Sequence, residues 1–220
     1  MITDLWPLFG LRLTTPRLEL RLPDLAELAA LGRLAAAGVH DPDVQPFVAA
    51  WTDGPPEQVA RNTIQFQWSA WGRWSPQDWT LQLVVLAGGE VIGTQGVDAR
   101  DFARLREVGT GSWLGRAFQG RGYGTEMRAA VLELAFEGLG AQYATSEAFE
   151  DNAASYAVSR KLGYIDDGVE RHIVRGAPKV GRRLRLDRAG WAAARRVPVQ
   201  ISGLEPCRPM FGPAEPTGGG

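Results

Sequence analysis

The stretch FQGRGYGTEMRAAVLELAF, residues 118–136, joins a glycine-rich loop directly to an amphipathic helix. Glycine tolerates positive φ and lets a ligand approach the backbone closely. Because Gly120, Gly122 and Gly124 alternate, successive backbone N–H groups can point outward and form an anion nest. The positive end of the following helix dipole adds to that nest. The stretch therefore predicts a site for a phosphate or pyrophosphate.

Three phosphate-binding loops compete for this stretch, and a glycine-rich helix start without a ligand stays open beside them. A Walker loop requires Gly-Lys-Ser/Thr, and the stretch contains no lysine. A dinucleotide loop requires a glycine where Thr125 stands and an acidic ribose partner further on, which we do not find. The third pattern, Gln-x-x-Gly-x-Gly, is matched in full by Gln119, Gly122 and Gly124.

Composition limits the class of protein. The chain has 220 residues, of which 45% are hydrophobic and 22% charged, so we expect a globular domain with or without an appendage. A formal net charge of −1 argues against a nucleic-acid binder. The single cysteine, Cys207, argues against a disulfide framework and a zinc site of the usual kind, and it favours a reducing cytoplasm. The two histidines leave little room for a His-dependent catalytic triad. We expect no membrane association, because the apolar runs are short and the start MITDLWPLFG lacks a basic segment.

Hydrophobic periodicity predicts an α+β chain. The expected order is strand, two helices, three strands, helix, strand, helix and two strands, with a hairpin turn at Gly88-Gly89. We interpret this as a mixed sheet of about seven strands flanked by helices. The predicted strands are 17–22, the two arms of the 78–97 hairpin, 107–115, 141–149, and two near 171–175 and 183–186.

The tail predicts an arm rather than a second domain. Residues 197–220 hold five prolines and five glycines, so we divide the chain into a domain at 1–196 and an arm at 197–220. VPVQISGL alternates like an added strand, and Met210 and Phe211 are poorly suited to solvent. We therefore predict a homodimer or larger assembly in which residues 197–212 reach a neighbouring subunit. Packing of the arm on its own domain is the alternative, and we expect PAEPTGGG to be disordered.

Further motifs carry a resemblance to a known family. NAASYAVSRKLGY at 152–164, SWLG at 112–115 and TTPRLELR at 14–21 join the glycine loop in order and spacing. With these four matches, the chain resembles the GNAT superfamily of N-acetyltransferases, in its ribosomal-protein-type (RimJ/RimL-like) subgroup. Similarity is greatest to actinobacterial members, some of which use succinyl-CoA. The resemblance implies the GNAT fold, in which the fourth and fifth strands splay apart.

The resemblance also implies an activity and a donor site. The activity is acyl transfer from acetyl-CoA or succinyl-CoA to an amine of a peptide, a protein or a small molecule. The loop would bind the pyrophosphate, and the fourth strand would pair with the pantetheine arm. For Asn152 and Ser155, capping of their own helix is the alternative role. The implied donor-binding residues are Trp113, Leu114, Gln119, Gly120, Arg121, Gly122, Tyr123, Gly124, Thr125, Asn152 and Ser155.

Catalytic candidates follow from the same resemblance. Ser159 stands where many members carry a tyrosine that protonates the departing thiolate, and Glu107 or Glu147 would accept the amine proton. Many relatives carry a carboxylate on the fourth strand at the position of Gly109. Ordinary solvated side chains are the alternative for all three candidates. Because Gly109 and Ser159 depart from common catalytic residues, a catalytically quiet acyl-CoA sensor is the alternative function.

Tryptophans mark the acceptor side. Five of them lie between residues 51 and 79, in the segment that walls the acceptor cleft of GNAT folds. We expect Trp51 and Trp74 to line that cleft. Asp53 lies in the same region and would attract a cationic amine.

Overall fold

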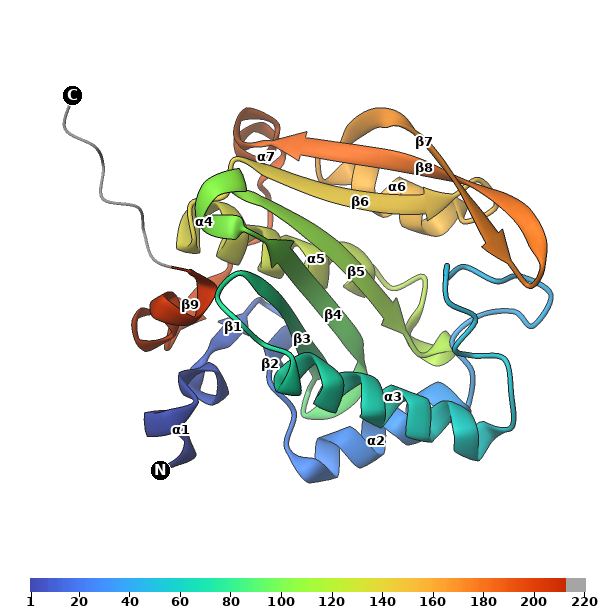
Figure 1. Ribbon diagram of the computed structural model, residues 1–220, viewed down its shortest axis with the longest axis horizontal. Helices are drawn as coiled ribbons and strands as arrows, with labels where there is room; N and C mark the ends of the chain where they lie inside the picture. Colours follow the sequence, from blue (N-terminus) through green and yellow to red (C-terminus); the bar gives the residue numbers. More distant parts are fainter. Residues whose placement is uncertain (213–220) are drawn as a thin grey trace.

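One mixed sheet runs through the computed structural model, which describes residues 1–212 (Figure 1). The described residues form nine strands in the order β7-β8-β6-β5-β4-β3-β2-β1-β9, and only the β5–β6 pair is parallel. The predicted α+β class is confirmed. The strands are β1 (Arg12–Thr14), β2 (Leu18–Arg21), β3 (Asp78–Ala87), β4 (Glu90–Arg100), β5 (Glu107–Leu114), β6 (Tyr143–Phe149), β7 (Ile165–Val174), β8 (Ala177–Asp187) and β9 (Gln200–Ser202).

The predicted count of about seven strands is wrong, because two short strands extend one side of the sheet. β1 pairs with β2, and β9 of the C-terminal arm then pairs with β1, so that Leu13 lies between Leu20 and Ile201. Each added strand has three residues, which is too short for a periodicity of two to be recognised.

The predicted helices all form. Asp24 and Glu27 make a capping box at the start of α2, which fixes where that helix begins. The α-helices are α1 (Ile2–Leu5), α2 (Leu25–Ala36), α3 (Pro56–Gly72), α4 (Phe102–Leu105), α5 (Tyr123–Glu133), α6 (Ala153–Lys161) and α7 (Arg188–Ala194). Shorter turns are the 3-10 segments η1 (Pro7–Gly10), η2 (Arg116–Phe118) and η4 (Glu205–Phe211) and the π turn η3 (Leu134–Gly138). None of the helices within residues 1–212 is long and apolar enough to cross a bilayer.

The core lies between the sheet and α5. The inward residues of β3, from Trp79 to Val85 at every second position, pack in one cluster with α5. Every residue of α5 from Glu126 to Glu133 is buried, which is the burial expected of a helix enclosed on all sides. On the other face of the sheet, α2 and α3 pack against Trp113 of β5 through a second cluster. The sheet therefore separates two hydrophobic clusters.

The arm packs on its own domain, which is the alternative stated above, and contact of residues 197–212 with a neighbouring subunit stays a prediction. Phe211 is fully buried, and its ring lies 5.0 Å from Trp79 and 5.5 Å from Trp74. The indole N–H of Trp74 donates to the carbonyl oxygen of Met210 at 3.0 Å. Met210 and Phe211 are thus covered within one chain. The oligomeric state stays a prediction, and PAEPTGGG (213–220) lies outside the described residues.

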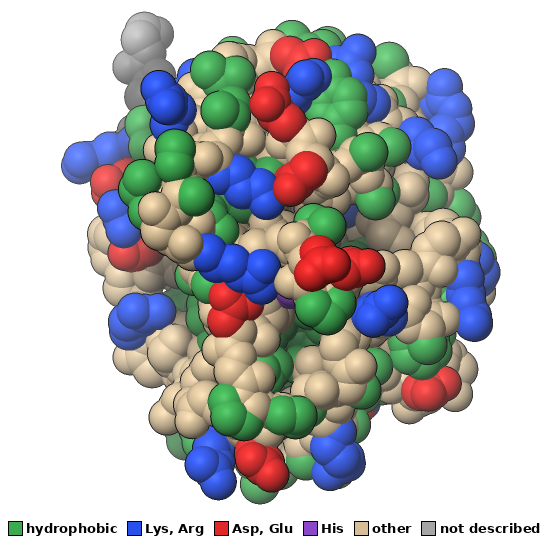
Figure 2. Space-filling view, turned by 90° about the vertical axis from the view of Figure 1, so that its right-hand side faces the viewer, with side chains coloured by type: hydrophobic (Ala, Val, Ile, Leu, Met, Phe, Trp, Pro, Cys, Tyr) green, Lys and Arg blue, Asp and Glu red, His purple; other side chains and the backbone are tan. Residues whose placement is uncertain are grey.

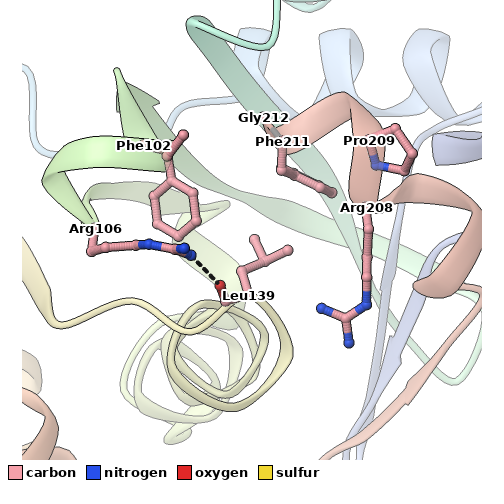
Figure 3. Close-up of a pocket in the computed structure, with 8 residues that line it drawn as sticks. Phe102, Arg106, Leu139, Arg208, Pro209, Phe211 and Gly212 are labelled. Carbon is pink, nitrogen blue, oxygen red and sulfur yellow. Dashed lines mark hydrogen bonds between the residues drawn. The ribbon is translucent and has the colours of Figure 1, made fainter. Parts of the chain in front are cut away.

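A cavity of about 340 Å³ lies where the arm meets α4 and η3 (Figure 3). Phe102, Arg106 and Leu139 line one side, and the other side is lined by Arg208, Pro209, Phe211 and Gly212. Arg106 closes part of it by donating to the carbonyl oxygen of Leu139 at 3.4 Å. This cavity is at the opposite end of the α5–η3 helix from the glycine loop, so we do not assign the predicted site to it.

Phe211→Ala tests the docking of the arm. We expect it to lower the free energy of unfolding by about 3–5 kcal/mol, because it removes a fully buried aromatic side chain. Cys207 reports the same event, because it is buried in η4 and burial raises the pKa of its thiol to about 11. We expect a thiol reagent at pH 8 to label folded wild-type protein slowly and the variant faster. Urea denaturation and labelling kinetics measure the two effects.

Phe66→Ala is the matched control, because the Phe66 side chain on α3 is 51% exposed. It is expected to change the free energy of unfolding by no more than about 0.5 kcal/mol and to leave labelling unchanged. Rapid labelling of Cys207 in the folded wild type would show that the arm is not docked.

Candidate functional site

The two parallel strands lose their pairing partway along the sheet. β5 and β6 are paired only at Glu107↔Tyr143, Val108↔Ala144 and Gly109↔Thr145. Beyond this point, β5 pairs only with β4 as far as Leu114, and β6 pairs only with β8 as far as Phe149. Figure 1 shows the two strands fanning apart. We call this opening the splay, and it confirms the predicted separation of the two strands.

The glycine loop lies beside the splay and presents backbone donors. Gly120 and Gly122 have φ of +74° and +82°, which a side chain would disfavour. α5 begins after Gly122 without a side-chain cap. Within the described residues, no protein group accepts hydrogen bonds from the backbone N–H groups of residues 120–125. Free backbone donors and the helix dipole are the features that the predicted pyrophosphate site requires.

Gln119 fixes the loop rather than presenting its own amide to a ligand. Its side-chain amide donates to the carbonyl oxygens of Val39 at 2.8 Å and Leu114 at 2.9 Å. These bonds tie the loop to the segment after α2 and to the end of β5. The Leu114 carbonyl is therefore already satisfied.

A second tether holds the first turn of α5. Glu126 is buried and accepts hydrogen bonds from the Thr15 hydroxyl at 2.7 Å and from Arg17 Nε at 2.7 Å. Arg17 also donates to the carbonyl oxygen of Arg121 at 3.0 Å and lies 4.7 Å above the ring of Tyr123. The glycine loop is therefore held on three sides by side chains that leave its N–H groups free.

Asn152 caps α6, which is the alternative role that the sequence analysis gives for it. Its Oδ1 accepts from the backbone N–H of Ser155 at 3.1 Å. Within residues 1–212, its Nδ2 group and the Ser155 hydroxyl have no protein partner. The cap thus orients Asn152 without using its donor group.

Ser159 is buried beneath the splay instead of lying at its surface. Its exposed fraction is 0%, and its hydroxyl oxygen accepts from Arg128 Nη1 at 2.7 Å. Arg128 also contacts the hydroxyls of Ser146 at 3.4 Å and Ser112 at 3.3 Å. The guanidinium thus reaches β5, β6 and α6 at the point where the strands separate. An amphipathic helix was predicted here, but α5 is buried on all sides, so Arg128 is enclosed as well.

On the opposite face of the sheet, an aromatic row borders the splay. Trp51 lies between Trp113 of β5 and Phe47, with ring centroids 5.7 and 5.1 Å apart. Trp51 is therefore next to the splay, where its predicted acceptor role requires it. Trp74 is not, because it packs with Trp79 and the arm.

Asp53 is engaged by another part of the chain. Arg175, in the turn of the β7–β8 hairpin, donates to its two carboxylate oxygens at 2.7 and 2.6 Å. The hydrogen bond from Arg175 is the main reason that the pKa of Asp53 is lowered. Lys179 of β8 also donates to the carbonyl oxygen of Gln45 at 2.7 Å. The α2–α3 loop (residues 37–55) is thus fastened to the hairpin, which corrects the prediction that Asp53 is free to attract an amine.

Figure 2 shows the end of the molecule that carries the β7–β8 turn and the α2–α3 loop, and acidic and basic side chains lie next to one another around hollows in that surface.

Glu147 forms a dyad with a histidine that the sequence did not single out. His172 Nε2 lies 2.6 Å from Glu147 Oε1, and the two side chains are 15% and 30% exposed. With Glu170, they are the one group of three metal-ligand-type side chains found among the described residues, with ligand atoms within 4.8 Å. We assign no metal to it, because His172 already has Glu147 as its hydrogen-bond partner. Glu107 instead pairs with Arg185 at 2.9 Å, where β5 and β6 are still joined.

Asp98 occupies the space above Gly109. The two residues are paired across β4 and β5, and a Cβ on Gly109 would lie 2.9 Å from Asp98 Oδ2. Although the residue as a whole is exposed, desolvation of its carboxylate and the nearby charge of Asp78 raise the pKa of Asp98, whereas Arg100 lowers it. A carboxylate is thus present at this position, carried by the neighbouring strand. The sequence could have indicated this carboxylate, because aligning the second arm of the predicted hairpin with the next predicted strand places Asp98 opposite Gly109.

Comparisons with known proteins match this arrangement. The family model described as "Acetyltransferase (GNAT) domain" matches residues 17–165. Among solved structures, Mycobacterium smegmatis RimJ in complex with CoA-disulfide is 18% identical, with a TM-score of 0.69 over 87% of this chain and 97% of that chain. RimL, a ribosomal L7/L12 alpha-N-protein acetyltransferase in complex with coenzyme A, is 17% identical, with a TM-score of 0.63 over 79% and 95%. A GCN5-related N-acetyltransferase from Brucella melitensis is 18% identical, with a TM-score of 0.64 over 84% and 81%. At these identities, the structures show a shared fold.

Glu126→Gln tests whether the tether at the start of α5 is held by charge. We expect it to lower the free energy of unfolding by about 1.5–3 kcal/mol, because a buried carboxylate loses its charge-assisted hydrogen bonds to Arg17. Glu137→Gln is the control, since its pair with Arg188 is at the surface and is worth at most about 1 kcal/mol. Urea denaturation of both variants measures the difference, and equal losses would contradict the assignment.

Proposed function

Because this chain belongs to the GNAT acetyltransferase family, we propose that it is an acyl-CoA-dependent N-acyltransferase. It transfers an acetyl or succinyl group to a primary amine of a peptide, a protein N-terminus or lysine, or a small molecule. One observation carries the proposal. The splay opens directly beside a loop whose N–H groups lack acceptors in the described chain, so a pyrophosphate and an extended thioester arm fit side by side.

The donor site consists of the loop, the splay and the start of α6. Gln119 holds the loop in place, residues 120–125 receive the pyrophosphate, and the backbone of β5 near Trp113 pairs with the pantetheine arm. Leu114 contributes its apolar side chain, since its carbonyl is taken by Gln119. Asn152 donates its Nδ2 group to a pantetheine amide, with the Ser155 hydroxyl beside it. When bound, acyl-CoA supplies an activated acyl carbon.

The acceptor enters from the other face, along the aromatic row. The amine nitrogen forms a bond to the acyl carbon, the C–S bond breaks, and the amine gives up a proton. A lysine amine with a pKa of about 10.4 is only about 0.1% neutral at pH 7, whereas an α-amine with a pKa of about 8 is about a tenth neutral. Trp51 and Trp113 present ring surface but no charge. This favours an α-amine, the acceptor type named for RimL.

Three carboxylates are candidates for the proton acceptor. Glu147 has His172 to receive the proton in turn, and Asp98 stands above Gly109 at the apex of the splay. Glu107 is the weakest of them, because it is paired with Arg185 away from the opening. Ser159 is the acid: its oxygen accepts from Arg128, so its own O–H remains free to donate to the sulfur and is polarised by the cation.

We further propose a cytoplasmic homo-oligomer that requires no metal and binds no nucleic acid. The alternative function is an acyl-CoA sensor that binds the donor without turnover. Gly109 and Ser159 favour this alternative, because they replace the usual catalytic residues of the family. Turnover with an amine panel separates the two functions.

Gly124→Glu tests the donor loop. Its Cβ has room, with Val158 Cγ2 at 3.7 Å, and replacing a helical glycine does not weaken the helix. The added carboxylate repels phosphates, so calorimetry is expected to show acetyl-CoA affinity reduced at least about tenfold. Gly72→Glu is the control, because its Cβ would meet open space near the end of α3. Equal affinities in the two variants would remove the loop from the donor site.

Ser159→Ala tests the acid. We expect kcat to fall about 10²–10⁴-fold with little change in the KM for acyl-CoA, because a proton donor acts in the transition state. Glu147→Gln, Glu107→Gln and Asp98→Asn identify the base by the same criterion, together with loss of the acidic limb of the kcat/KM pH profile. If all four variants stay within a few-fold of wild type, the chain catalyses by positioning alone.

A further inference from the structure

The buried segment of α5 carries three charged side chains, and two of them form ion pairs with a residue of opposite charge. Glu126 pairs with Arg17 at 2.6 Å, and Glu133 pairs with Arg195. The third, Arg128, is 4% exposed, and no carboxylate within residues 1–212 pairs with it. Burying a cation without a counter-charge costs desolvation free energy, and an anion bound beside Arg128 would offset that cost.

The partners of Arg128 are all hydroxyl groups. Two of its three contacts, to Ser112 and Ser146, are long at 3.3 and 3.4 Å, and its Nε has no partner. Tyr164 lies close by, but burial raises the pKa of its phenol, so it remains neutral and supplies no counter-charge. Burial likewise lowers the pKa of the Arg128 guanidinium.

The cluster therefore consists almost entirely of donors. Each serine oxygen accepts from the guanidinium and keeps its own O–H free to donate, and Arg128 Nε–H is also available. The three serines stand on β5, β6 and α6, so the donors converge on the splay from three sides. A group of this kind is complementary to an anion that enters between the strands.

Resting on the proposed function, we propose that Arg128, with Ser112 and Ser146, is a receptor for a carboxylate at the far end of the acyl chain. The preferred donor is then an acyl-CoA whose acyl group ends in a carboxylate. A planar guanidinium matches a carboxylate with two parallel hydrogen bonds, whereas a thiolate offers one atom and exists only during turnover. A bound carboxylate neutralises Arg128 for as long as the donor is bound.

A pair of matched donors tests the receptor without any acceptor. Succinyl-CoA and butyryl-CoA have acyl chains of equal length, and a methyl group replaces the carboxylate in the second. Calorimetry on the full-length wild type is expected to give a Kd for succinyl-CoA at least about tenfold below that for butyryl-CoA. Equal values would overturn the proposal, whatever the variants do.

Arg128→Met is expected to abolish the preference while acetyl-CoA still binds. Arg33→Met on the exposed side of α2 is the control and is expected to keep the preference. If Arg128→Met fails to fold by circular dichroism, Ser112→Ala replaces it and is expected to reduce the preference several-fold. A uniform loss of affinity for all three donors would instead make Arg128 a structural or thiolate-binding residue and overturn the proposal. If no acyl-CoA binds to the wild type, the proposed function fails as well, which distinguishes the two failures.

Discussion

The loss of backbone pairing between β5 and β6 after Gly109 and Thr145 is the constraint on which the rest of the structure depends. Unpaired strand edges inside a protein are unstable unless something satisfies them. Here, β4 and β8 hold the two strands from outside, and Thr110 bridges the apex by donating to the Thr145 carbonyl at 3.1 Å. Everything proposed for the donor, the acid and the base is arranged around this one interruption.

The two faces of the sheet carry different sets of candidate functional residues. On the face of α5 lie the loop, which is exposed to solvent, and the buried side chains of Arg128 and Ser159. On the face of α2 and α3 lie Trp51 with Trp113, Asp98, and the Glu147–His172 pair. Since the splay lies between the two faces, it is the place where the proposed donor and acceptor would meet. A fold with continuous pairing would keep these groups apart.

Sequence patterns predicted what depends on local chemistry. The glycine loop, the hairpin at Gly88-Gly89 and the α6 start at Asn152 each require particular residues at fixed spacing, and each formed as expected. Failures came where a distant residue decides the outcome. Trp74 and Asp53 were placed in a cleft, but the arm recruits the first and Arg175 the second. The burial of Arg128 could not be predicted, because an amphipathic pattern gives no sign that the whole helix is enclosed.

Docking of the arm also determines how one side of the sheet ends. An uncovered strand offers a row of free N–H and C=O groups on which other chains can polymerise. Here, the last strand is β9, which has only three residues and is followed by Gly203 and the η4 turn, so it is too short to act as a template. The arm thus protects this edge from aggregation. A chain without the arm would expose β1 and the hydrophobic surface around Trp79 together, and its solubility would fall.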